Sequence, residues 1–263
     1  MTPKALETLC SEAAVLGGEV LKERWCQTRT ISFKGDINLV TDADTASEKV
    51  ILDYLRERCP NDSVLAEESG ATGGNGPTAR RWYIDPLDGT TNYAGGIPHF
   101  AVNVAVADAE GMAAAATLDP LRGELFLAAR GEGATLNGRR IQCSSQSELI
   151  QSVLATGFAV DIHFDHEHPL KLFAAYLRRS RALRRFGAAA LDLAWVACGR
   201  FEGFWEQKLN PWDIAAGLLL VREAGGVVSD FSGQPEVLTR GEIMAGSRAI
   251  HRQLMEVMRN PNF

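Results

Sequence analysis

Two aspartates, a glycine and two threonines follow an apolar stretch in RWYIDPLDGTTNYAGG, residues 81–96. Residues 82–84 suit the interior of a sheet, and the proline that follows Asp85 ends the strand. Asp85 and Asp88 can then both face the space beyond the strand. Backbone N–H groups at a helix start attract phosphate, whereas carboxylates repel it, and divalent cations between them reconcile the two. The segment therefore predicts a Mg²⁺ site that takes a phosphate group, with a capped helix start as the alternative.

Further acids that such a site needs occur elsewhere in the chain. Glu67 and Glu68 end a short strand predicted in SVLAEESG, and Asp213 lies in the first turn of a helix that follows Pro211. An acid in a first helical turn can also serve only to offset the helix dipole. These acids are far apart in the sequence, so a shared site requires the fold to bring them together.

The elements that must position these residues follow from hydrophobic periodicity. We expect helices over residues 5–24 and about 42–58, the second capped by Thr41 with Asp44 or by Thr45 with Glu48. A strand or hairpin is expected near residues 28–40 and a strand over 81–86. The region after residue 98 has β-branched runs separated by glycine turns, which predicts an antiparallel meander up to about residue 140.

The second half of the chain alternates between strands and helices. Strands are predicted in SVLATGF, RALRRFG and GGVVSDFSG, and helices over residues 169–179, 188–198, 212–224 and 248–259. This alternation is typical of α/β architecture, whereas the first half has an α+β pattern. We therefore expect an α/β protein with an N-terminal half at residues 1–143 and a C-terminal half at residues 144–263.

The composition excludes several classes of protein. The chain has 263 residues and a net charge of −6, which does not favour nucleic-acid binding. A basic run, RRSRALRR, is expected to spread across a helix end and the following strand. The odd number of cysteines, five, without a C-x-x-C pair, together with an N-terminus unlike a signal peptide, favours a reducing cytoplasm. No apolar run approaches the roughly 18–20 residues of a membrane span.

Five segments, in order, resemble the inositol monophosphatase family of Mg²⁺-dependent, Li⁺-sensitive phosphatases. They are KGDINLVTDAD (34–44), AEES (66–69), YIDPLDGTTNY (83–93), RRFGAAALDLAWVACGRFEGFWE (184–206) and NPWDIAAGLLLVREAGGVVSDFSG (210–233). The resemblance spans nearly the whole chain. It implies a layered αβαβα sandwich of the inositol monophosphatase and fructose-1,6-bisphosphatase type, and a homodimer.

The resemblance also implies roles for individual residues. Two or three Mg²⁺ ions are expected on Glu67, Asp85, the Leu87 carbonyl, Asp88 and Asp213. Glu67 and Thr90 match the pair that orients the attacking water, which the metal activates, and Asp44 matches the acid that hydrogen-bonds the threonine. The expected substrate-binding residues are Asp88, Gly89, Thr90, Thr91, Ala189 and Glu206.

The substrate that these residues imply is a small phosphorylated alcohol, and inositol 1-phosphate fits best. Histidinol phosphate, fructose 1,6-bisphosphate and NADP are alternatives within the family. Thr91 stands where relatives acting on 3′-phosphoadenosine 5′-phosphate usually show lysine, which argues against that substrate. Ala188 stands where many relatives carry serine or threonine, so the preferred alcohol is left open.

Two rival hypotheses belong to other classes. The haloacid-dehalogenase phosphatases use a D-x-D-x-T nucleophile, and DADTAS (42–47) misses it because its threonine comes one residue early. The second rival is a regulatory protein that binds the transcription machinery.

The histidines of DIHFDHEH, namely His163, His166 and His168, could hold a transition metal, but we expect a polar loop there.

Overall fold

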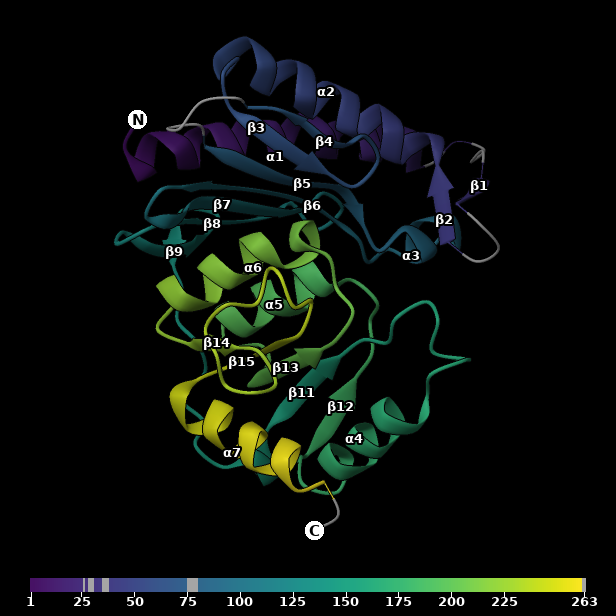
Figure 1. The fold of residues 1–263 in the computed structure, drawn as a ribbon, viewed down its shortest axis with the longest axis vertical. Helices are drawn as coiled ribbons and strands as arrows, with labels where there is room; N and C mark the ends of the chain where they lie inside the picture. Colours follow the sequence, from purple (N-terminus) through teal and green to yellow (C-terminus); the bar gives the residue numbers. More distant parts are fainter. Residues whose placement is uncertain (26, 28–30, 35–37, 75–79, 262–263) are drawn as a thin grey trace.

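The computed structural model describes residues 1–25, 27, 31–34, 38–74 and 80–261, and in it the chain forms five stacked layers (Figure 1). Helices α1 (Pro3–Trp25) and α2 (Asp42–Arg58) cover one face of an eight-stranded sheet. Helices α5 (Ala189–Ala197) and α6 (Pro211–Glu223) lie between this sheet and a five-stranded sheet. Helices α4 (Glu167–Leu177) and α7 (Arg248–Arg259) cover the far face. The expected αβαβα sandwich is confirmed.

The start of α2 is fixed by the first of the two predicted capping boxes. The Thr41 hydroxyl accepts a hydrogen bond from the Ala43 N–H, and the Asp44 carboxylate accepts one from the Thr41 N–H. Glu48 has another role, because its carboxylate accepts the N–H groups of Glu68 and Ser69 at 2.8 Å each. Helix α2 therefore holds the chain that follows β3 in place.

The predicted hairpin near residues 28–40 is present in part. Strands β1 (Ile31–Lys34) and β2 (Asn38–Thr41) pair in antiparallel register. Residues 28–30 and 35–37 of that prediction lie outside the described residues.

The eight-stranded sheet has the order β10-β9-β8-β7-β6-β5-β3-β4. Its strands are β3 (Ser63–Ala66), β4 (Gly70–Gly73), β5 (Arg81–Asp88), β6 (Ala101–Asp108), β7 (Gly111–Asp119), β8 (Glu124–Ala129), β9 (Gly133–Leu136) and β10 (Arg139–Arg140). The predicted meander supplies β6 to β10. Strand β4 was not predicted, because its four residues, Gly-Ala-Thr-Gly, carry turn chemistry rather than strand chemistry. Strands β3 and β5 run parallel, so their carboxyl ends meet at one edge.

The five-stranded sheet has the order β12-β11-β13-β15-β14. Its strands are β11 (Val153–Thr156), β12 (Ala182–Arg184), β13 (Gly203–Glu206), β14 (Val227–Ser229) and β15 (Ile243–Gly246). Strands β13 and β15 were not predicted. Both are four residues long and wholly buried, so no alternation of polar and apolar residues marks them.

Two short helical elements remain among the described residues. A 3₁₀ turn, η1 (Leu149–Gln151), precedes β11, and helix α3 (Thr90–Ala94) follows β5. The basic run spreads from the end of α4 through β12, as its sequence predicts. Among the described residues, no helix has the length and apolar character needed to cross a bilayer.

The two sheets divide the chain in a simple way. The larger sheet takes its strands from residues 63–140, and the smaller takes its strands from residues 153–246. Helix α6 nevertheless packs on both sheets, so its first turn reaches the junction between them. The boundary at residues 143 and 144 stays a prediction.

Candidate active site

The carboxyl ends of β3 and β5 bring the first acids together. Glu67 follows β3 directly, and its N–H donates to the carbonyl of Ile84 at 3.1 Å. The register between β5 and β6 shifts between Asp85 and Asp88, where Pro86 interrupts the ladder. Asp85 is buried and accepts the N–H of Leu87 at 3.0 Å. Asp85 and Asp88 are both still paired with β6, opposite Asn103 and Ala101, and the irregularity lies between them.

The turn into α3 places Thr90 against Asp44. Gly89 caps α3 with a φ of 89°, in the left-handed region that favours glycine. The hydroxyl of Thr90 lies 3.2 Å from Asp44 Oδ1 and 3.1 Å from the carbonyl of Leu87. Asp44 Oδ2 accepts the N–H and hydroxyl of Thr41 at 2.8 and 2.5 Å. Asp44 therefore joins the start of α2 to the start of α3.

Asp213 reaches the site from the other half of the chain. It occupies the first turn of α6, where its Oδ2 accepts the N–H of Asn210 at 2.7 Å in a capping box. Asn103 of β6 donates to the carbonyls of Trp212 and Asp213 at 2.7 and 3.3 Å. The hydroxyl of Thr117 donates to Asn103 Oδ1 at 2.7 Å, which fixes the amide. A buried amide in the larger sheet thus holds the start of α6.

A second contact joins the halves at Asp88. Asp88 Oδ2 accepts the N–H of Ala190 at 2.8 Å, at the start of α5. Asn92 of α3 donates to the carbonyls of His99 and Phe186 at 2.8 Å each. The segment that leads into α5 is therefore fixed to the segment that carries Asp88.

These contacts enclose a cavity of about 210 Å³ at the junction of the two halves. Every predicted metal-ligating and substrate-binding residue lines it, and Asp44 lies behind Thr90. The lining residues are Glu67, Asp85, Leu87, Asp88, Gly89, Thr90, Thr91, Gly157, Phe158, Val160, Arg185, Gly187, Ala189, Glu206, Leu209 and Asp213.

The acids of the cavity favour their protonated forms. Burial first, and then the charge of Asp213, raise the pKa of Glu67 to about 8. Burial is also the main cause that raises the pKa of Asp88 and of Asp213 to about 7 each. Burial and the charge of Glu67 hold the pKa of Asp85 well above its ordinary value. Ionisation of these acids is therefore costly unless a positive partner occupies the cavity.

The donor atoms fit a hard divalent cation. Four carboxylates and the Leu87 carbonyl offer only oxygen, which Mg²⁺ prefers, and the mutual repulsion of the acids favours a bound cation. Within the described ranges, no three His, Cys, Asp or Glu side chains are already arranged to hold a metal ion.

Sequence reasoning missed part of the cavity wall. Gly157 follows β11, and a Cβ built there would lie 2.1 Å from a carboxylate oxygen of Glu206, so a larger residue would displace that carboxylate. A glycine directly after a strand was the available signal. Arg185 and Leu209 also line the cavity, and nothing local in the sequence marks them. Burial, then Asp213, raises the pKa of Glu206 to about 8, while Arg185 lowers it.

The histidine-containing loop is organised by other residues. Lys208 donates to Asp161 and Asp165 at 2.9 and 2.8 Å. His163 stacks on Phe164, whose side chain is 80% exposed. Among the described residues, no three His, Cys, Asp or Glu side chains in this loop are arranged to hold a metal ion.

Replacing Asn103 by alanine is expected to lower the free energy of unfolding by about 3 kcal/mol, because the buried Thr117 hydroxyl and Trp212 carbonyl lose their partner. Urea denaturation measures this change. The exposed Asn61→Ala is the control and should change stability by less than about 0.5 kcal/mol. Equal effects of the two substitutions would contradict the role of Asn103 at the junction.

Fold and site together define a class of protein: an αβαβα sandwich with an oxygen-rich, acid-lined cavity between its sheets. The model of the inositol monophosphatase family matches residues 4–261, and the chain belongs to this family. Membership supports phosphatase activity. The family is generally Mg²⁺-dependent, in agreement with the donor atoms of the cavity.

Known relatives carry two kinds of name. The chain is 40% identical over 264 residues to an inositol-1-monophosphatase of Synechocystis, covering 98% of this chain and 91% of the relative. It is 44% identical over 229 residues to the Nus factor SuhB of Pseudomonas aeruginosa, covering 86% and 84%.

Solved structures share the whole fold. The extragenic suppressor protein SuhB of Bartonella henselae superposes with a TM-score of 0.93 at 38% identity, covering 97% of this chain and 99% of that one. The inositol monophosphatase of Anabaena superposes with a TM-score of 0.87 at 39% identity, covering 97% and 96%. The predicted fold type is therefore confirmed.

Proposed function

We propose that the chain is a Mg²⁺-dependent phosphatase of small phosphomonoesters, with inositol 1-phosphate as its preferred substrate. The observation that carries the proposal is the convergence of Glu67, Asp85, Asp88 and Asp213 on the cavity that also exposes Gly89, Thr90 and Thr91. Mg²⁺ would be held by the four acids and the Leu87 carbonyl. When bound, it lowers the pKa of water and screens the charge of the phosphate.

Glu67, Thr90 and Asp44 have complementary parts in handling the water. Asp44 accepts the proton of the Thr90 hydroxyl, so the oxygen of that hydroxyl is free to accept a hydrogen bond from water. Glu67, across the same cavity, accepts the proton that water gives up. Water oriented in this way attacks phosphorus as the bond from phosphorus to the alcohol oxygen breaks, and that oxygen takes up a proton, equivalent to the one given to Glu67, and leaves as the alcohol. Because water attacks directly, no phosphate is attached to the protein.

The phosphate and the alcohol occupy different walls. Gly89 brings the backbone close to the phosphate, and the first N–H groups of α3, those of Thr90 and Thr91, donate to it together with the hydroxyl of Thr91. Glu206 and Asp88 accept hydroxyl groups of the alcohol, and Ala189 borders that part of the cavity. A polyol phosphate matches this division better than an ester without further hydroxyls.

A kinetic comparison of phosphomonoesters in the presence of Mg²⁺ tests the proposal. Inositol 1-phosphate should give the highest kcat/KM, ahead of histidinol phosphate, fructose 1,6-bisphosphate and NADP. Excess Li⁺ should inhibit. Full activity in EDTA would contradict the metal-dependent mechanism, and labelling of the protein by substrate phosphate would favour the haloacid-dehalogenase mechanism.

Replacing Glu206 by glutamine is expected to raise KM for inositol 1-phosphate by about tenfold, because an amide replaces the carboxyl group that accepts hydrogen bonds from the hydroxyls. The KM for p-nitrophenyl phosphate, which has no hydroxyl beside the phosphate, should change little. Glu132→Gln, on the exposed surface, is the matched control. An equal change for both substrates would contradict the assignment of Glu206 to the alcohol.

A second candidate function is regulation through the transcription machinery. It is favoured by the relatives named Nus factor SuhB. Asp88→Asn separates the two functions, since it should abolish phosphatase activity and leave a binding function intact. A cellular phenotype that survives this substitution would support the regulatory role.

We also propose that the protein lies in the cytoplasm and forms a homodimer. The four described cysteines, Cys10, Cys59, Cys143 and Cys198, are free, which suits a reducing cytoplasm. The homodimer that the resemblance implies stays a prediction, and light scattering measures it.

A further inference from the structure

A second, larger cavity adjoins the active site at the junction of the two halves. Its volume is about 580 Å³, within the range of small-molecule sites. It shares the side chain of Leu209 with the active-site cavity. Its lining residues are Leu65, Arg81, Tyr83, Lys208, Leu209, Asn210, Pro211, Leu238, Thr239, Arg240 and Gly241.

The floor of this cavity is continuous with the active site. Side chains alternate along a strand, so Arg81, Tyr83 and Asp85 share one face of β5. Leu65 is paired in register with Tyr83 on the neighbouring strand. The opposite wall is joined by a hydrogen bond from the Leu209 N–H to the Gly241 carbonyl at 2.9 Å. Ordered elements of both halves therefore form this cavity.

The cavity carries three positive charges. Arg81, Lys208 and Arg240 line it, and no aspartate or glutamate of the described chain does. Lys208 pairs with Asp161 and Asp165, and Arg240 pairs at 3.2 Å with Asp230, all three outside the lining. These pairs hold two of the cations in position.

Arg81 is the cation that is free to bind a ligand. It is exposed, and none of the carboxylates that the structure describes forms an ion pair with it. Its guanidinium lies 5.8 Å from the centre of the Tyr83 ring. The nearby acid Glu236 accepts the N–H groups of Leu238 and Thr239, so its carboxylate is occupied by the turn.

The other surfaces of the cavity suit an apolar ring. Tyr83 is half-buried, and Leu65, Leu209 and Leu238 are partly buried beside the cations. A planar group can stack on a tyrosine ring and cover aliphatic side chains. Thr239 adds a hydroxyl. The combination is larger and more apolar than a single phosphate requires.

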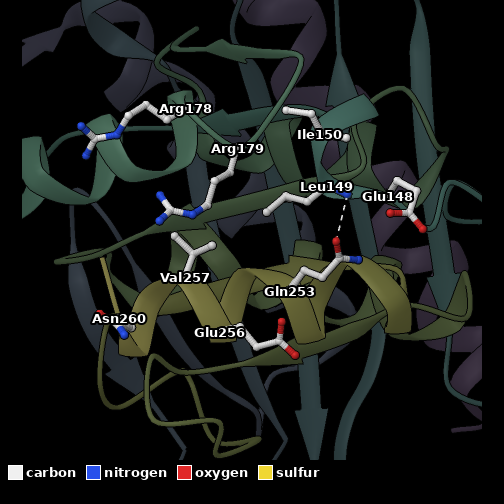
Figure 2. Close-up of a pocket in the computed structure, with 9 residues that line it drawn as sticks. All are labelled: Glu148, Leu149, Ile150, Arg178, Arg179, Gln253, Glu256, Val257 and Asn260. Carbon is white, nitrogen blue, oxygen red and sulfur yellow. Dashed lines mark hydrogen bonds between the residues drawn. The ribbon is translucent and has the colours of Figure 1, made fainter. Parts of the chain in front are cut away.

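A cavity of similar volume elsewhere lacks this charge pattern. It measures about 560 Å³ and lies between η1, the end of α4 and α7 (Figure 2). Arg178 and Arg179 line it together with Glu148 and Glu256, so the charges balance. Of these two cavities, only the one beside the active site has cations and no acid among its described lining residues, and Arg81 is the cation there that no described carboxylate pairs with.

We propose that the cavity beside the active site binds a small molecule that carries phosphate groups and a planar ring, as a nucleotide does. Arg81 binds the phosphates, because a guanidinium group suits phosphate geometry, and the paired cations Arg240 and Lys208 lie beside them. The ring stacks on Tyr83. The bound molecule lies against Leu209 and so next to the entrance of the catalytic cavity.

Calorimetric titration of the metal-free protein with ATP in EDTA tests the proposal, since binding without metal does not depend on phosphatase activity. ATP should bind about tenfold more tightly than tripolyphosphate, which lacks the ring. Arg81→Ala should weaken ATP binding by about tenfold. Arg139→Ala removes an equally exposed arginine of the same sheet and should have no effect.

Thr239→Glu is the second variant, because it places a carboxylate in the cavity on an exposed loop residue. It should also weaken ATP binding by about tenfold. Absence of ATP binding to the unaltered protein would overturn the proposal. So would equal effects of Arg81→Ala and Arg139→Ala, or equal affinities for ATP and tripolyphosphate.

Discussion

Asp85→Asn is expected to lower kcat by about 10³-fold. Loss of one carboxylate weakens metal binding, and the stabilisation that the metal gives to the transition state falls by several kcal/mol. The substitution should not destabilise the fold. Burial and the neighbouring Glu67, Asp88 and Asp213 already favour the neutral form of Asp85. The melting temperature of the metal-free variant should therefore equal or exceed that of the metal-free unaltered protein, and Mg²⁺ should stabilise the variant less.

The control for this prediction is Asp53→Asn on α2, which removes one exposed carboxylate and its surface pair with Lys49. Such pairs contribute little to stability, so activity and the effect of Mg²⁺ should be unchanged. Steady-state kinetics and thermal unfolding with Mg²⁺ or EDTA provide the readouts. Normal kcat in Asp85→Asn would refute its assignment as a metal ligand.

The metal-free protein is expected to lose stability as the pH rises from about 6.5 to about 8.5. The pKa is about 8 for Glu67 and about 7 for Asp88 and Asp213 in the folded chain. These carboxyls titrate near 4 in the unfolded chain. Over the window the folded chain binds more protons, so stability falls with rising pH. Mg²⁺ requires the ionised forms, so its stabilising effect should grow with pH.

Melting temperatures measured across this window, with EDTA or with Mg²⁺, check the prediction. The window starts at about 6.5 because burial lowers the pKa of His99 to about 4, which gives the opposite trend at lower pH. KCl at matched ionic strength is the control for screening. A stabilisation by Mg²⁺ that did not change with pH would count against the acid cluster as its binding site.

The sequence predicted the chemistry of the site better than its walls. Asp85, Asp88, Gly89 and Thr90 occur in one short segment, where local geometry decides their arrangement. Asp213 needed only a helix start, which Pro211 marks. Glu67 was indicated by the end of a predicted strand, and the family resemblance added Asp44 and Glu206. In each of these cases a local signal or a shared motif was sufficient.

What the sequence did not predict depends on contacts between distant segments. Strands β13 and β15 are short and buried on both faces, so their pairing partners define them rather than their pattern. Gly157 matters only because Glu206 lies against it. Asn103 reads as one polar residue in an apolar strand, and its bond to the start of α6 is visible only in three dimensions.

The active-site cavity is built from two stretches of the chain, and the two stretches have different proposed roles. Apart from Asp213, the acids proposed to bind the metal come from residues 67–88, whereas the side proposed to face the alcohol comes from residues 157–209. Under the proposed assignment, mutations in the later stretch can alter which alcohol fits and spare the hydrolytic machinery. Substrate range can therefore diverge between descendants of one ancestor without loss of catalysis at any intermediate stage.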